Sequence, residues 1–121
     1  MLPTHTDPAL IEWLASAPPE SIDELPYGVI GMSPDGNVVI YNRTEALFAR
    51  LTPERVKGNH FFRAIAPCTN NDLISHRFET EAEIDALIDY VFTLRMKMTP
   101  VRLRLLKRSD IALMYLIVVR T

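Results

Sequence analysis

The spacing of hydrophobic residues changes early in the chain. In the first segment Leu10, Ile11 and Leu14 recur at the intervals of one helical face, and the Ala-Pro-Pro at residues 17–19 ends the pattern. The spacing therefore predicts short helical structure. Because a short helix cannot bury its own apolar face, we expect residues 1–25 to form an N-terminal helical cap that docks on the rest of the chain.

After this segment the apolar runs shorten and take the composition of β-strands. Residues 27–32 and 37–41 are rich in β-favouring side chains, and the Ser-Pro-Asp-Gly between them is typical of a tight turn. The pattern predicts a β-hairpin. Asn42 then precedes a helical pattern over residues 43–50, so we expect its side chain to cap that helix.

The second half of the chain predicts one longer helix and three strands. Leu73, Ile74 and Phe78 recur on one side of an amphipathic helix. Three β-rich runs follow, and Thr99-Pro100 separates the first run from the second. We expect these strands to cover residues 87–98, 101–107 and 111–119.

The order of these elements indicates an α+β fold. A hairpin, a helical middle and three consecutive strands give a central five-stranded antiparallel sheet with short helices on one face. This layout matches the PAS fold, which hosts many sensory and ligand-binding functions, so the fold alone specifies no activity. We assign residues 26–121 to a PAS domain and residues 1–25 to the cap.

Composition narrows the class of protein. A length of 121 residues suits one domain, and a net charge of −2 argues against the basic face that nucleic acid requires. No apolar run reaches the roughly 18 residues needed to cross a bilayer, so we expect no membrane association. The one cysteine and the lack of a signal-peptide pattern favour the cytoplasm. We expect a monomer or a weak dimer.

The single cysteine, Cys68, is the candidate reactive group. It follows Pro67, whose ring stiffens the backbone that presents the thiol. Such a thiol is either a packed core residue or a reactive nucleophile and attachment point. No histidine lies at a metal-ligand spacing from it, and the nearest in sequence, His60, has no evident orienting acid. We therefore expect neither a metal site nor an enzyme.

A resemblance to a known family sharpens this choice. Tyr-Asn-x-x-Glu at residues 41–45 is followed 23 residues later by the cysteine of Ala-Pro-Cys-Thr. With these motifs, residues 22–121 resemble the photoactive yellow protein family of small bacterial blue-light receptors. The further matching residues are Asp35-Gly36-Asn37, Gly58, Asn59-His60-Phe61-Phe62, Phe78 and Met98-Thr99-Pro100.

The resemblance implies a covalent chromophore. In that family a cysteine carries 4-hydroxycinnamic acid (p-coumaric acid) as a thioester, so Cys68 would be the attachment point. Tyr41 and Glu45 would donate hydrogen bonds to the phenolate oxygen, which a buried anion needs because an unpaired buried charge is costly. The residues that the resemblance places around the chromophore are Tyr41, Glu45, Ala49, Leu51, Phe61, Ala66, Pro67, Thr69, Leu94 and Met98.

The resemblance also implies a light-driven switch. Trans–cis isomerisation would move the phenolic oxygen away from its donors, and Glu45 would give up its proton. The buried carboxylate left behind would loosen the cap. Met98 would assist the thermal return to the dark isomer. The output would be a signal to a downstream protein that the sequence does not identify.

A second interpretation keeps the fold without this chemistry. In it the chain is a PAS sensory or interaction module that binds a small ligand, or none, and has no covalent chromophore. The joint presence of Tyr41, Glu45 and Cys68 favours the photoreceptor, since a bare module has no need of all three.

Two positions depart from the family pattern. The family places a threonine four residues after the glutamate and an arginine six residues after it, whereas this chain has Ala49 and Leu51. Loss of the threonine removes a hydrogen bond of about 1 kcal/mol from the Tyr41 hydroxyl. Leu51 replaces a cationic lid by an apolar one. We predict that the site still binds the chromophore, with an altered phenolate pKa and altered recovery kinetics.

The Leu51→Arg variant tests this expectation. Restoring a cation beside the phenolate should shift the pH at which acid removes the visible absorption band, because a nearby charge changes the proton affinity of the anion. Acid titration of the band in the variant and in the parent measures the shift. Equal midpoints would contradict the prediction.

Overall fold

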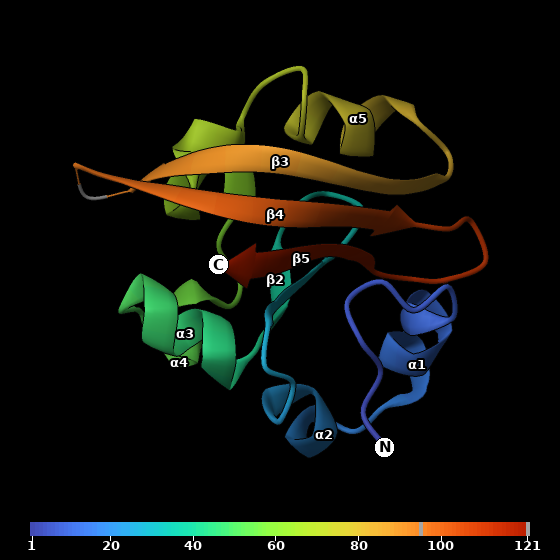
Figure 1. Ribbon diagram of the computed structural model, residues 1–121. Helices are drawn as coiled ribbons and strands as arrows, with labels where there is room; N and C mark the ends of the chain where they lie inside the picture. The colour runs from blue at the N-terminus through green and yellow to red at the C-terminus, as the bar shows by residue number, and fades with distance from the viewer. Residues whose placement is uncertain (95, 121) are drawn as a thin grey trace.

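A five-stranded antiparallel sheet forms the centre of the molecule and confirms the α+β layout (Figure 1). The computed structural model describes residues 1–94 and 96–120, apart from the side chain of Leu94. The strands lie in the order β2-β1-β5-β4-β3, so β5, the last strand of the chain, is central. Their bounds are β1 Gly28–Met32, β2 Val38–Tyr41, β3 Ile84–Leu94, β4 Lys97–Lys107 and β5 Met114–Arg120.

The predicted bounds of two of these strands were wrong. Thr99-Pro100 does not separate β3 from β4 but lies inside β4, where Thr99 pairs with Phe92 and Pro100 with Val91. Pairing of β4 with β5 begins only at Val101. Proline, which has no N–H to donate, is tolerated there because this end of β4 has a partner strand on one side only.

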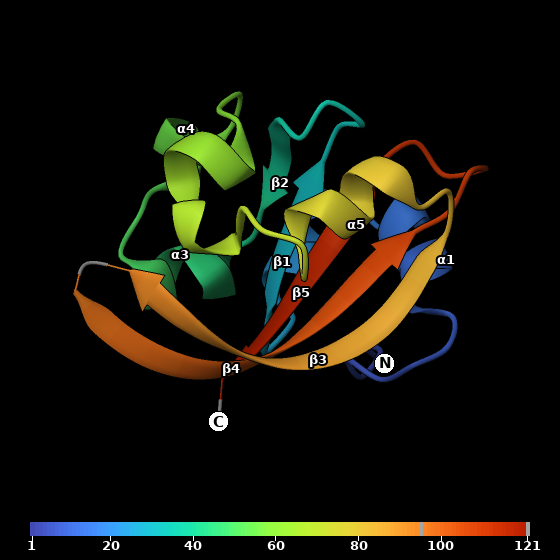
Figure 2. The same ribbon diagram turned by 90° about the horizontal axis from the view of Figure 1, so that it is seen from above.

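Short helices cover one face of the sheet and a separate helical segment covers the other. Figure 2 shows α3, α4 and α5 within the curve of the sheet, while α1 and α2 belong to the first 25 residues and pack on the opposite face. The helices are α1 Leu10–Ser16, α2 Pro19–Asp23, α3 Arg43–Ala49, α4 Pro53–Val56 and α5 Ser75–Thr80, with a π-helical turn η1 at Phe61–Ile65 and a 3-10 turn η2 at Pro67–Thr69. The sequence predicted a longer helix before the third strand, but the structure has only the short α5 there.

Asn42 confirms its predicted role as a helix cap. Its Oδ1 accepts the backbone N–H of Glu45 at 3.1 Å and that of Val29 at 2.9 Å. Its Nδ2 donates to the carbonyl oxygens of Ile22 and Tyr27, each at 3.0 Å. One buried side chain thus joins the start of α3, strand β1 and the N-terminal segment.

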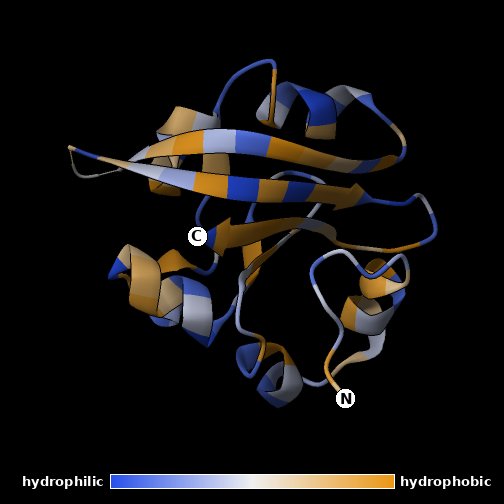
Figure 3. Cartoon of the chain, viewed as in Figure 1, coloured by the Kyte–Doolittle hydropathy of each residue, from blue (hydrophilic) through white to orange (hydrophobic). Residues whose placement is uncertain are grey.

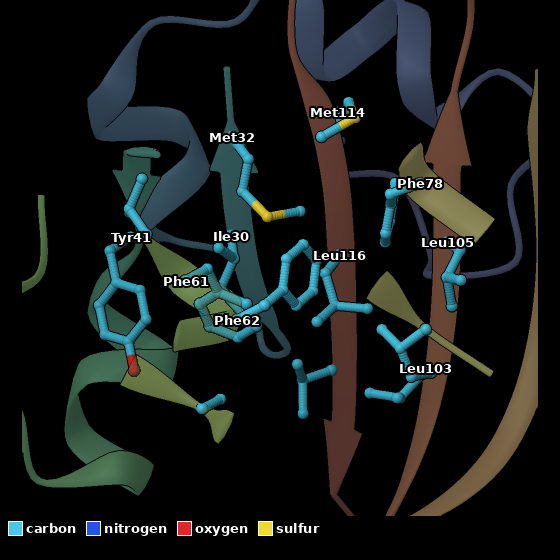
Figure 4. Packing of buried hydrophobic residues seen from close by; sticks show 14 of the residues in the cluster. Ile30, Met32, Tyr41, Phe61, Phe62, Phe78, Leu103, Leu105, Met114 and Leu116 are labelled. Atoms are coloured by element: carbon cyan, nitrogen blue, oxygen red, sulfur yellow. The ribbon is translucent and has the colours of Figure 1, made fainter. Parts of the chain in front are cut away.

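The hydrophobic core has two parts, one on each face of the sheet. Figure 3 shows β5 hydrophobic along most of its length, as expected for a central strand covered on both faces, whereas β4 alternates. The helix-side cluster, part of which appears in Figure 4, includes Ile30, Met32, Tyr41, Phe61, Phe62, Phe78, Phe92, Leu103, Leu105 and Leu116. The cap-side cluster includes Leu10, Ile11, Leu14, Ile22, Leu25, Val29, Leu106, Tyr115 and Ile117.

Arg104 on β4 fastens the beginning of the chain to the sheet. Its guanidinium donates from Nε and Nη2 to the two carboxylate oxygens of Asp85, each at 2.9 Å. Its Nη1 donates to the backbone carbonyl oxygens of His5, at 2.9 Å, and Asp7, at 2.7 Å. The side chain is only 4% exposed, so these bonds are largely shielded from water.

Substitution of Arg104 should weaken the cap much more than substitution of Arg102. Arg102, two residues away on the same face, is 52% exposed and pairs with Asp89 alone. We expect Arg104→Gln to lower the free energy of unfolding by about 2 kcal/mol and Arg102→Gln by at most about 0.5 kcal/mol. Urea unfolding measures both losses, and amide hydrogen exchange in residues 5–16 reports release of the cap. Similar losses for the two variants would contradict the prediction.

Candidate functional site

Tyr41 and Glu45 lie on consecutive elements, because a strand runs directly into a capped helix. Tyr41 ends β2, and its ring is buried at one edge of the helix-side cluster (Figure 4). Glu45 lies in the first turn of α3, where the Asn42 cap fixes its backbone N–H. This geometry places a phenol and a carboxyl group on the helix side of the sheet. The joint role that the Tyr-Asn-x-x-Glu motif implies for these two groups stays a prediction.

Gly28 makes room for the Glu45 carboxyl group. It is the first residue of β1, and a Cβ at this position would overlap Oε1 of Glu45. The close approach of strand and carboxylate therefore requires glycine. This constraint explains how the Glu45 carboxyl group can approach β1 so closely.

Arg120 is the main partner of Glu45. The guanidinium donates from Nη1 to Oε1 at 2.6 Å and from Nη2 to Oε2 at 3.1 Å. The Arg120 side chain is 12% exposed and that of Glu45 is 3% exposed, so the pair is almost entirely buried. Burial raises the pKa of the Glu45 carboxyl group, and the hydrogen bonds and charge of Arg120 oppose the rise. The expected role of Glu45 as a donor to a phenolate stays a prediction.

Cys68 is presented on a backbone with several fixed hydrogen bonds. It is the middle residue of η2, and its side chain is half-buried against the helix-side cluster. The backbone carbonyl of Cys68 accepts the Tyr90 hydroxyl at 2.6 Å and Nδ2 of Asn71 at 3.3 Å. The neighbouring Thr69 hydroxyl donates to the carbonyl of Ala66 at 2.7 Å. The Cys68 thiol therefore lies on a turn whose backbone is hydrogen-bonded to Tyr90 of β3 and to neighbouring residues of the same segment.

A continuous series of contacts joins the cysteine to the glutamate. Tyr90 bonds the Cys68 carbonyl, and its ring meets the Phe92 ring edge to face at 6.2 Å between centroids. Phe92 in turn lies 5.8 Å from the Arg120 guanidinium, which holds Glu45. A thiol thus lies at one end of this series and a paired charge at the other, with aromatic rings between them.

Most of the other predicted site residues belong to the same region. They are buried in the helix-side cluster, packed against it or, in the case of Thr69, buried in η2, and they are Ala49, Leu51, Phe61, Ala66 and Thr69. Their roles toward a chromophore stay predictions.

Two predicted site residues are not brought into this group, and a third cannot be placed. Met98 is 73% exposed, and alternation along β4 puts it on the face of Arg102, opposite that of Val101. Pro67 is exposed at the start of η2. The side chain of Leu94 lies outside the described residues.

Sequence reasoning missed Arg120 and Tyr90. Both could have been found from strand alternation, because Arg120 follows Leu116 and Val118 on the core-facing side of β5. Tyr90 shares its side of β3 with Phe92 in the same way. A charged residue that continues a core-facing series requires a buried partner, and this requirement is the signal that was available.

Neither a metal centre nor a membrane span is found in the part of the chain that the structure describes. Over residues 1–94 and 96–120, no group of three or more His, Cys, Asp and Glu side chains could hold a metal ion. Within the same ranges, no helix has both the length and the apolar character that a bilayer crossing needs.

Comparison with known proteins identifies the family. No protein-family model matches the chain. A photoactive yellow protein of Rhodothalassium salexigens is 32% identical over 87 residues, which cover 69% of this chain and 70% of the relative. The chain belongs to the photoactive yellow protein family. A photoactive yellow protein of Halochromatium salexigens is 30% identical over 97 residues, or 78% of each chain.

Solved structures agree with this family membership. The photoactive yellow protein domain of the sensor histidine kinase Ppr from Rhodospirillum centenum matches with a TM-score of 0.81 and 32% identity, over 89% of this chain and 97% of that domain. A PAS domain of an HTR-like protein from Haloarcula marismortui, at 11% identity, has a TM-score of 0.68 and shows likeness of fold alone. The predicted PAS fold is confirmed. The curated relative is named a photoactive yellow protein, and the solved domain at 32% identity belongs to a sensor histidine kinase.

The buried carboxyl group predicts a specific pH dependence of stability. Because burial raises the pKa of Glu45 above its ordinary value of 4.5, the folded protein keeps this proton to higher pH than the unfolded chain does. The free energy of unfolding should therefore fall as pH rises from 4.5 through the folded pKa. Glu45→Gln, which cannot ionise, should remove this component.

Urea unfolding between about pH 4 and pH 8 measures the effect. Glu54→Gln is the matched control, since Glu54 is exposed in the first turn of α4 and its substitution also removes one negative charge. We expect the control to follow the parent. If Glu45→Gln shows the same pH profile as the parent, the explanation is wrong.

Proposed function

We propose that this protein is a blue-light photoreceptor that carries 4-hydroxycinnamic acid as a thioester on Cys68. Two relatives at 32% and 30% identity are photoactive yellow proteins, which supports a PAS photoreceptor of that type. The observation that carries the proposal is that Tyr41 and Cys68 lie in or against the helix-side cluster, while the buried Glu45 is linked to Phe92 of that cluster through Arg120. A packing cluster by itself requires neither a thiol nor a buried acid at these points.

The residues fit such a group at both ends. Cys68 offers a half-buried thiol on a fixed turn, and its sulfur can form the thioester with an activated acyl group while the leaving group takes the thiol proton. Phe61 and Phe92 offer apolar rings for an aromatic body. Tyr41 and the Glu45–Arg120 pair offer polar groups for the phenolic oxygen. When bound, the chromophore supplies visible absorption and a double bond that isomerises in light.

The other residues of the chain would convert the optical event into a structural one. In the proposed cycle Glu45 would give its proton to the phenolic oxygen of the bound group, which would leave a carboxylate in the interior. A change of charge at that point acts on α3, whose first turn contacts the N-terminal segment. The Thr44 hydroxyl donates to the carbonyl of Leu25, and the backbone N–H of Arg43 donates to Asp23. Release of the cap is the proposed output.

The output would be read by a signalling partner of unknown identity. The solved domain at 32% identity is part of a sensor histidine kinase, which supports a role in signal transduction. The cytoplasmic location, the monomeric or weakly dimeric state and the absence of nucleic-acid or membrane partners remain predictions from the sequence.

One observation favours the alternative of a PAS module without a covalent chromophore. Glu45 accepts two hydrogen bonds from Arg120, whereas the photoreceptor scheme has it donate to a phenolate. In the alternative, the pair is a structural element of the core, and Cys68 is a packed thiol. Chromophore loading distinguishes the two functions.

Loading of the purified protein tests the proposed function. The parent and Cys68→Ala are incubated with the anhydride of 4-hydroxycinnamic acid and followed by intact mass and absorption. We expect the parent to gain one acyl group and a blue-absorbing band that bleaches in light and recovers in darkness, and Cys68→Ala to gain neither.

A Cys68→Ser variant controls for side-chain size, since its less nucleophilic hydroxyl should not form a stable adduct. A parent that stays unmodified and colourless under these conditions would exclude the photoreceptor and leave the PAS module.

A further inference from the structure

Arg120 is a largely buried cation to which the proposed photoreceptor scheme gives no role in the proton transfer. It lies on the last strand of the chain, 75 residues from the glutamate that it binds. Among the ion pairs of residues 1–94 and 96–120, Glu45–Arg120 is the pair in which both side chains are largely buried. A buried pair of this kind is costly to form, so its presence beside a ligand site calls for a functional explanation.

We propose that Arg120 is the counterion of the chromophore site. Its guanidinium would bind the phenolate end of the chromophore, and its positive charge would balance a single negative charge shared between Glu45 and the phenolic oxygen. The inference rests on the proposed function. It adds a positioning and charge-setting residue that lies outside the Tyr41, Glu45 and Cys68 motif.

The surroundings of the guanidinium fix its orientation. Its central carbon lies 5.0 Å from the centre of the Phe48 ring and 5.8 Å from the centre of the Phe92 ring. Both distances are within the range of a cation–π contact. Two of its nitrogens are bonded to the Glu45 carboxylate. The Arg120 guanidinium is thus pre-organised by the two rings and by the carboxylate along one of its edges. Because its orientation is already fixed, it loses little side-chain entropy on binding a further anion.

Charge counting gives the consequence for a bound phenol. Glu45 and Arg120 together are neutral, and an added phenolate would leave two anions beside one cation in a site shielded from water. Because an uncompensated buried charge is costly, one proton should remain, either on Glu45 or on the phenolic oxygen. Without the Arg120 guanidinium, neither the Glu45 carboxylate nor the phenolate has a cation to compensate its charge. Both groups should then keep their protons.

Among residues 1–94 and 96–120, the ionisable groups on the elements around this pair, on this side of the sheet, supply no second buried cation. Tyr41 on β2, Tyr90 on β3 and Cys68 on η2 are neutral when protonated. Arg50, which ends α3, and Arg63 in η1 are exposed, so water screens their charges. Arg120 is thus the buried cation placed to set the charge of this site.

This assignment also gives a physical meaning to Leu51. The family resemblance expects a cation at that position, and the leucine here is a half-buried apolar residue packed against the core. Arg120 supplies a cation from β5 instead of from the segment after α3. The same charge balance is then achieved from a different element of the fold.

Acid titration of the loaded protein tests the counterion role. The probe is the protein loaded with 4-hydroxycinnamic acid, and the observable is the midpoint pH at which the visible band is lost. We expect Arg120→Gln to raise this midpoint by at least about one pH unit, a tenfold change in proton affinity. Arg120→Lys, which keeps the charge, should restore part of the shift, and Arg102→Gln, on the opposite face, should match the parent.

A second comparison covers the case in which Arg120→Gln folds poorly because Glu45 is left buried and unpaired. Glu45→Gln is compared with the double variant Glu45→Gln/Arg120→Gln, neither of which contains the buried carboxylate. The double variant should have the higher midpoint, since it alone lacks the cation. Equal midpoints in this comparison would overturn the counterion role.

A third measurement needs no chromophore. Thermal unfolding of the unloaded variants should show that Glu45→Gln lowers the melting temperature when Arg120 is present and raises it when Arg120→Gln is already in place. In the parent background the substitution strands a buried guanidinium, whereas in the variant background it removes a stranded carboxylate. Equal effects in the two backgrounds would show that the residues are not coupled and would overturn the inference.

The outcomes separate the two proposals. A parent that takes up no acyl group overturns the proposed function and the counterion role with it. A parent that loads and bleaches, together with an Arg120→Gln variant that titrates at the parent's midpoint, overturns the counterion role alone. Loading of the parent and a raised midpoint in Arg120→Gln support both.

Discussion

The four hydrogen bonds of the buried Asn42 side chain hold the parts of this molecule together. They reach Val29 on β1, Glu45 on α3 and the carbonyl oxygens of Ile22 and Tyr27. Each bond is modest by itself, but loss of this side chain would leave several backbone groups unsatisfied in the interior, where each costs about 1–3 kcal/mol. The position of α3, and therefore of the carboxyl group that it carries, depends on this one amide.

The functional site lies on the helix that the Asn42 side chain positions, because this helix also carries the buried carboxyl group of Glu45. Glu45 enters the interior because Gly28 leaves space for its carboxyl group, and it stays there because Arg120 neutralises it. Glu45, which carries the charge, directly follows Thr44, whose hydroxyl bonds the carbonyl of Leu25 in the N-terminal segment. A change of charge and a change in cap contacts therefore share one short element, and no long path through the protein is needed to connect them.

The two faces of the sheet use arginine in different ways. On the cap side, Arg104 binds backbone carbonyls near the start of the chain, and its carboxylate partner Asp85 is largely exposed. On the helix side, Arg120 pairs with a carboxylate that is itself buried. The first arrangement fastens a segment, and the second creates a site whose charge is sensitive to any anion that enters. Family membership alone would not reveal this difference, because it follows from where each strand places its polar residues.

Local patterns in the sequence determined much of this structure. The Asn42 cap, the first hairpin and the existence of five strands follow from capping chemistry, turn residues and side-chain alternation, all of which act over a few residues. The length of α5, the place of Thr99-Pro100 inside β4 and the Glu45–Arg120 pair were decided by tertiary structure. Whether a proline must break a strand depends on which neighbours that strand has, and a buried charge is acceptable only where a distant partner meets it. Both conditions involve residues that are close in space and far apart in the chain, so no local pattern contains them.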